Sequence, residues 1–87
     1  LSHGHVDHVG DAITIARHCG AAVIAPFELA QFCLRRGVEK VIPMNIGGSH
    51  RESSFVVKMT IARHSSAYVT DAEIIYTGSP CAYLITM

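Results

Sequence analysis

The sequence lacks a disulfide pattern, a signal-peptide pattern and a long apolar run. It has no tryptophan and three prolines, and its three cysteines (Cys19, Cys33, Cys81) are odd in number and far apart. This spacing is not that of a disulfide framework, and it lacks the C-x-x-C pairs of a structural zinc site, so we expect reduced thiols in the cytoplasm. No apolar run approaches the roughly 18 residues that cross a membrane, and no signal-peptide pattern is present. We therefore expect no membrane span.

An excess of charge of either sign is also missing. Seven Lys and Arg residues balance seven Asp and Glu residues, and Arg35-Arg36 is the only basic run. Proteins that bind nucleic acid usually carry a basic stripe. The composition therefore argues against a nucleic-acid partner.

Apolar residues, by contrast, are abundant for so short a chain. They make up 49% of 87 residues, and the mean hydropathy is +0.31. A chain of this length is one domain at most (residues 1–87) and buries only roughly 60–65% of its unfolded surface. We therefore expect some apolar surface to meet a further part of a larger fold or another subunit. The chain is then a fragment of a longer domain, or it self-associates as a homo-oligomer.

The pattern of apolar residues predicts strand–helix pairs followed by a run of strands. Gly20 and Gly37 are expected to end the two helices, and Pro26 to open the second. We expect helices at Val9–Cys19 and Pro26–Arg36, strands at Ala21–Ala25, Val38–Ile42, Phe55–Ala62, Glu73–Thr77 and Cys81–Thr86, and a loop at Pro43–Ser49. This order indicates an α/β layered domain.

Histidine is the unusual residue, with six in the chain and three in its first eight positions. In an extended segment, His3 and His5 project to the same side and reach one ion together. Gly4 between them allows the backbone to turn tightly. Asp7 and His8 follow where a helix begins, which aims them at a second, adjacent ion. Imidazole with carboxylate suits zinc, with manganese or iron as alternatives; Asp7 has a second interpretation, as a helix N-cap.

The stretch Ser2-His3-Gly4-His5-Val6-Asp7-His8 resembles the signature motif of the metallo-β-lactamase superfamily. Further segments are similar to a branch of that superfamily known as uncharacterised metal-dependent hydrolases. These segments are Gly10-Asp11, Met44 to Gly48, Ala62 to Ser66, Asp71 to Tyr76, and Gly78-x-Pro80. The resemblance implies a partial αβ/βα sandwich, about half of the family's four-layer fold.

The resemblance also implies a ligand set. His3, His5 and His64 would bind the first metal, and Asp7 and His8 would contribute to the second. His64 is expected just past the strand Phe55–Ala62, where a loop presents a ligand to a site. His18 and His50 match no ligand position and are interpreted as surface groups.

The chain departs from the family pattern in what it lacks. The family has a bridging aspartate and a further histidine on later strands, which these 87 residues do not include. The three histidines leave a fourth position open for water, as in a catalytic zinc site. Asp7 and His8 alone are too few for tight binding of a second ion. Ala72 and Ala82 stand where relatives usually carry glycine.

The implied function is metal-dependent hydrolysis of a small-molecule ester, lactone, amide or phosphodiester by a metal-bound hydroxide. Asp7 would orient the nucleophile, and Ser65, Ser66 and Asn45 are candidates for holding the imidazole rings. Ser2 is interpreted as a strand-end residue. The alternative is a truncated, non-catalytic fragment that binds metal or self-associates, and we expect the isolated 87 residues to be inactive. A nuclease, as found elsewhere in the superfamily, fits poorly with the neutral charge.

Overall fold

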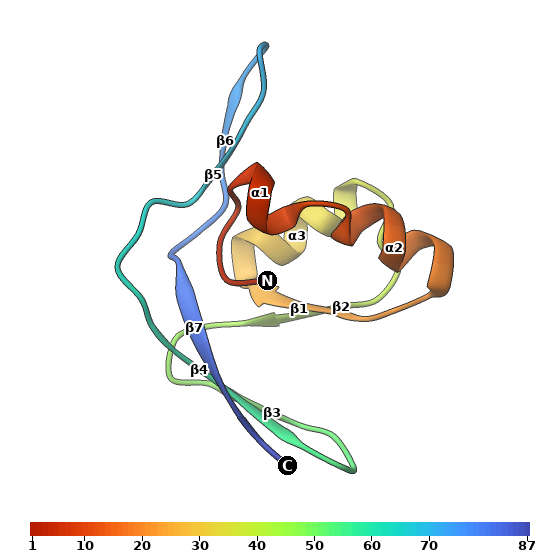
Figure 1. Ribbon diagram of the computed structural model, residues 1–87, viewed down its shortest axis with the longest axis vertical. Coiled ribbons are helices and arrows are strands. Elements are labelled where there is room, and N and C mark those ends of the chain that lie inside the picture. Colours follow the sequence, from red (N-terminus) through yellow and green to blue (C-terminus); the bar gives the residue numbers. More distant parts are fainter.

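The computed structural model describes residues 1–87 and consists of a helical half followed by a strand-rich half (Figure 1). The first half contains α1 (Val6–Val9), α2 (Ala12–Cys19), β1 (Val23–Pro26), α3 (Phe27–Arg35) and β2 (Val41–Met44). The second contains β3 (Ser49–Arg51), β4 (Val56–Ile61), β5 (Ala67–Val69), β6 (Ile74–Tyr76) and β7 (Cys81–Thr86). The helices gather beside β1 and β2, while the β5–β6 hairpin and the β3-β4-β7 sheet extend in opposite directions.

The first predicted helix is divided in two. Gly10 adopts φ 48°, and its amide donates to the carbonyl of Val6, which ends α1. The chain then starts α2 at Ala12, so the expected continuous helix from Val9 is wrong at its beginning. Its end is confirmed, because Gly20 has φ 70° and donates to Ala16 in a left-handed cap.

The two short strands of the first half pair in parallel, with Val23 opposite Val41. Helix α3 connects them, as parallel pairing requires. Both strands begin and end later than predicted, and Pro43 belongs to β2 instead of to a loop. Proline is tolerated there because β2 is an edge strand of a two-stranded sheet.

The main core lies between α3 and the β1–β2 pair. Leu29, Ala30 and Cys33 of α3 are fully buried, together with Ala25 of β1. Val9, Ala16 and Val38 belong to the same cluster. A second, smaller cluster of Met44, Met59 and Cys81 lies where β2, β4 and β7 meet, and it joins the two halves of the chain.

The second half is antiparallel throughout. Strand β4 lies between β3 and β7, with Lys58 opposite both Ser49 and Leu84. Strands β4 and β7 follow the prediction closely, whereas β3 and β5 were not expected from the sequence. Strand β5 pairs with β6 to form a separate hairpin. The loop that precedes this hairpin carries His64.

Much of the apolar excess lies on the surface. Large apolar side chains that are at least 44% exposed occur on helices and strands alike, among them Ile15, Ile61, Leu84 and Ile85. None of the helices has the length and apolar character that a membrane crossing requires.

We predict that the buried face of α3 dominates stability. Leu29→Ala should lower the free energy of unfolding by about 3 kcal/mol, because it removes a fully buried side chain and leaves a cavity. Leu34→Ala on the same helix is the matched control. Leu34 is 44% exposed, so this change should cost about 1 kcal/mol or less. Urea denaturation followed by circular dichroism measures both, and equal losses would contradict the assignment of the core.

Candidate metal centre

The first residues of the chain are held between the two halves of the molecule. The Leu1 nitrogen donates to the carbonyl of Ile24 in β1 (2.7 Å), and the Cys81 amide of β7 donates to the carbonyl of Ser2 (2.9 Å). The Tyr83 hydroxyl donates to the Leu1 carbonyl. Burial raises the pKa of Tyr83, so this hydroxyl keeps its proton. These contacts fix the position of the segment that carries His3 and His5.

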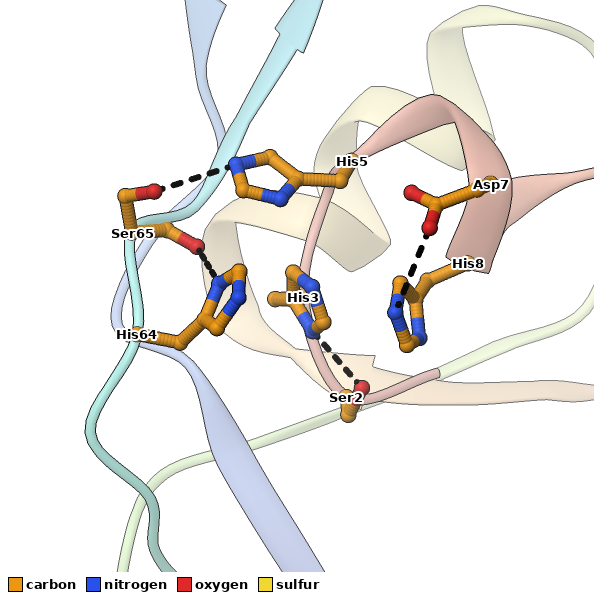
Figure 2. A network of polar contacts seen from close by, with 7 residues as sticks. All are labelled: Ser2, His3, His5, Asp7, His8, His64 and Ser65. Atoms are coloured by element: carbon orange, nitrogen blue, oxygen red, sulfur yellow. Dashed lines mark hydrogen bonds and ion pairs between the residues drawn. The ribbon is translucent and has the colours of Figure 1, made fainter.

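Three histidines meet beside this segment, two from the segment itself and His64 from the loop after β4. The ring centroid of His64 lies 4.4 Å from that of His3 and 4.8 Å from that of His5. The centroids of His3 and His5 are also 4.8 Å apart. One nitrogen from each ring can be chosen so that all lie within 4.8 Å of one another. Figure 2 shows the three rings turned toward a common space. The structure thus brings together the three residues that the sequence singled out for one metal.

Hydrogen bonds occupy one nitrogen of each ring and leave the other free. His64 Nδ1 donates to the Ser65 carbonyl (2.8 Å), which leaves the lone pair on Nε2. His5 Nε2 contacts the Ser65 hydroxyl (3.2 Å), and His3 Nδ1 contacts the Ser2 hydroxyl (2.8 Å) (Figure 2). Metal-binding histidines are typically oriented in this way by a partner on the non-ligating nitrogen.

His3 Nε2 is the ring nitrogen with the strongest physical reason to bind an ion. It is buried and has no hydrogen-bond partner, although buried polar groups almost always find one. Burial lowers the pKa of His3 from its ordinary value of 6.5, and the nearby His8, His64 and His5 lower it further, partly opposed by Asp7. The ring is therefore neutral at physiological pH, which is the form that binds metal. The donor set fits a divalent cation.

Asp7 and His8 lie on the rim of this cluster, in the short helix α1. The His8 ring centroid is 4.0 Å from that of His3, so the structure places His8 against the site. The Asp7 carboxylate is 3.7 Å from His8 Nε2, and its side chain is 81% exposed. The N-cap of α1 is His5, without a side-chain cap bond, so the interpretation of Asp7 as the N-cap is wrong.

The supporting residues differ in part from those expected. Ser65 contacts His5 and His64, in line with the prediction. Ser66 instead accepts a hydrogen bond from the Gly4 amide, and the Asn45 carbonyl closes a turn with Gly48. Neither makes a hydrogen bond to an imidazole, so the expectation that they hold the rings is wrong.

The supporting roles of two residues were not predicted from the sequence. Ser2 holds the His3 ring, and its position directly before His3 was the only signal for this role. Thr77 is fully buried behind Gly4, more than 70 positions along the chain, and no local pattern indicates that contact. His18 and His50 lie outside the cluster, as expected; His50 pairs with Glu52 (2.8 Å).

The chain matches a known protein family and several related proteins. The family model of the metallo-beta-lactamase superfamily matches residues 1–77. A UPF0173 metal-dependent hydrolase of Bacillus cereus strain AH187 is 50% identical over 88 aligned positions, and one of Geobacillus sp. strain WCH70 is 51% identical over 87. Each alignment includes 99% of this chain and 38% of the relative.

Among solved structures, the chain is similar to Igni18, described as a novel metallo hydrolase from the hyperthermophilic archaeon Ignicoccus hospitalis. The TM-score is 0.79 at 30% sequence identity, over 99% of this chain and 35% of that one. The chain thus spans 38% of the length of the curated bacterial relatives. These shares agree with the partial domain expected from the sequence.

We predict that the metal-free chain loses stability as the pH falls below 6.5. The pKa of His3 is lowered in the folded state, so in this range the unfolded chain takes up a proton that the folded chain rejects. Protonation therefore favours unfolding. Urea denaturation after chelator treatment, at pH 7.0 and 5.5, measures the effect. His3→Asn should weaken the pH dependence, whereas His18→Asn, at an exposed position on α2, should leave it unchanged. Equal pH dependence in both variants would contradict this account of His3.

Proposed function

The chain belongs to the metallo-β-lactamase superfamily, and on that premise we propose that it carries the principal metal-binding segment of a metal-dependent hydrolase. The observation that supports this most is the meeting of His3, His5 and His64, each with one ring nitrogen free. The unpartnered, buried Nε2 of His3 adds to it. The relatives named above are themselves described as metal-dependent hydrolases.

Zinc is the ion that we propose for the three-histidine cluster. Three neutral imidazoles with an open fourth position are typical of catalytic zinc, while manganese and iron favour sites with more oxygen ligands. Manganese and iron remain the alternatives if a carboxylate joins the set. Asp7 and His8 would contribute to a second position, but two ligands from this chain are too few to hold an ion tightly.

A divalent ion in such a site, when bound, acidifies a coordinated water and polarises a carbonyl or phosphoryl oxygen. The residues of this chain would orient the ligands and the attacking water. Ser2 and Ser65 hold the rings of His3, His5 and His64 in their orientation. The exposed Asp7 carboxylate, beside His8, would accept a proton from the attacking water and orient it. We propose an ester, lactone, amide or phosphodiester of a small molecule as the substrate class.

A second candidate applies to these 87 residues alone: metal binding, or self-association, without turnover. It is favoured by the share of the relatives that the chain spans, 38%, and by the exposed apolar side chains of the sheet. We further propose a reducing, cytoplasmic setting, which the three free cysteines support.

We predict that the chain binds one zinc ion tightly. Equilibrium dialysis followed by elemental analysis should give a stoichiometry near one, and His64→Ala should abolish tight binding because it removes one of three ligands. His18→Ala is the matched control, since His18 lies on α2 away from the cluster. Two tightly held ions per monomeric chain, or full retention of zinc by His64→Ala, would contradict the proposed ligand set.

We also predict that hydrolysis by the full-length gene product depends on His5. With p-nitrophenyl acetate and bis-p-nitrophenyl phosphate as probes, His5→Ala should lower kcat/KM by more than about 100-fold, beyond what loss of an outer partner usually costs. His50→Ala is the control, because His50 pairs with Glu52 outside the cluster. Turnover that survives exhaustive chelation would refute a metal-dependent mechanism.

A further inference from the structure

Two buried hydroxyl groups lie against the backbone between the paired histidines. The Ser66 hydroxyl accepts a hydrogen bond from the Gly4 amide (3.0 Å) and contacts the Thr77 hydroxyl (2.9 Å). Ser66 is 6% exposed and Thr77 is fully buried. Ser66 directly precedes β5 and Thr77 directly follows β6, so both come from the base of one hairpin. We name Ser66 and Thr77 together the hydroxyl clamp.

Gly4 is required by this packing and not by its backbone conformation. It is absent from the glycines with positive φ, so the tight turn that the sequence suggested is not the reason for glycine here. A Cβ atom at position 4 would lie 1.9 Å from Thr77 Oγ1, 2.6 Å from its Cβ and 2.8 Å from its Cγ2. Backbone and side chain are thus in direct contact, with no room for even a methyl group.

We propose that the hydroxyl clamp positions the Gly4 peptide and thereby sets the separation of the His3 and His5 rings for metal binding. This inference rests on the proposed function. Successive side chains of an extended segment point to opposite sides, so a contact on the Gly4 side supports the segment from behind. The ligand nitrogens then face the opposite side with their spacing fixed.

The connection to His64 strengthens this assignment. His64 is a ligand candidate, Ser65 holds the rings of His5 and His64, and Ser66 holds the Gly4 amide. Three consecutive residues therefore supply a ligand, a ring support and a backbone support. The Thr77 amide also donates to the Ser66 carbonyl (3.4 Å), which ties the two ends of the hairpin together behind the segment. Ser66 and Thr77 are positioning residues that act through Gly4.

The hydroxyl groups can be tested separately from the shape of the side chains. Thr77→Val keeps a branched side chain and removes the hydroxyl, Thr77→Ser keeps the hydroxyl, and Ser66→Ala removes the acceptor for the Gly4 amide. Thr70→Val is the matched control. Thr70 lies at the turn of the same hairpin, where its hydroxyl bonds only to residues of that turn.

Zinc affinity of the 87-residue chain, measured by competition with a chelating dye, is the principal readout. Ser66→Ala and Thr77→Val should weaken zinc binding about 10- to 100-fold, the usual effect of losing a supporting partner of a ligand. Thr77→Ser and Thr70→Val should bind within about twofold of the unsubstituted chain, by the same measure. The visible spectrum of the cobalt-substituted chain should change in Ser66→Ala and Thr77→Val alone. Circular dichroism on each metal-free variant establishes that it is folded.

The outcomes separate the two proposals. Folded Ser66→Ala and Thr77→Val variants with unchanged zinc affinity and cobalt spectrum would overturn the hydroxyl clamp and leave the proposed function standing. Failure of the unsubstituted chain to bind zinc, manganese or iron would overturn the proposed function and the clamp's role in metal binding with it. One measurement needs no variant: the Gly4 amide, which lies outside helices and strands, should exchange slowly with solvent. Exchange at the rate of an open loop would also overturn the clamp.

Discussion

The attachment of the N-terminal segment to both halves of the molecule is the constraint on which the rest depends. Ile24 in β1 and Cys81 in β7 belong to different sheets; Ile24 accepts a hydrogen bond from Leu1, and Cys81 donates one to Ser2. The segment is therefore held at the junction of the helical half and the strand-rich half. His3 and His5 come from this segment and His64 from the strand-rich half, so the histidine cluster exists only when the halves are assembled. Formation of the cluster therefore requires that both halves are folded and in contact.

Burying the histidine cluster without an ion costs free energy of folding, and a bound ion would offset this cost. His3 is buried with Nε2 unpartnered, and its neighbours are other imidazoles. Only 19 of 87 residues are buried, so the core has little free energy to spare for an unsatisfied polar group. A cation that binds the folded chain alone stabilises it by mass action, and it replaces the missing partner of His3. The geometry thus couples occupancy of the site to stability of the whole chain.

The features that could be predicted from the sequence are those with local causes. Gly20 ends α2 because its left-handed conformation closes the last turn, and β7 follows from a short apolar run after a turn. The candidate metal ligands could be named because four of them, His3, His5, Asp7 and His8, lie in one motif and His64 in a second. What could not be predicted depends on contacts distant in sequence. Strands β3 and β5 are three residues long and exist only through their partners, and the role of Thr77 depends on a segment more than 70 positions away.

Under the proposed function, metal binding and substrate selection belong to different parts of the molecule. The three histidines, the serines that orient them and the hydroxyl clamp all lie between positions 2 and 77, almost the same span that the family model matches. Ser65 and Ser66 directly follow the ligand candidate His64, so the proposed first metal site and its supports come from the same region. Asp7 is exposed at the rim and His8 lies against His3, and a second ion there would need ligands from another source. If the cluster binds an ion as proposed, these residues set the position of that ion, and the choice of substrate belongs to whatever surrounds the open side of the cluster.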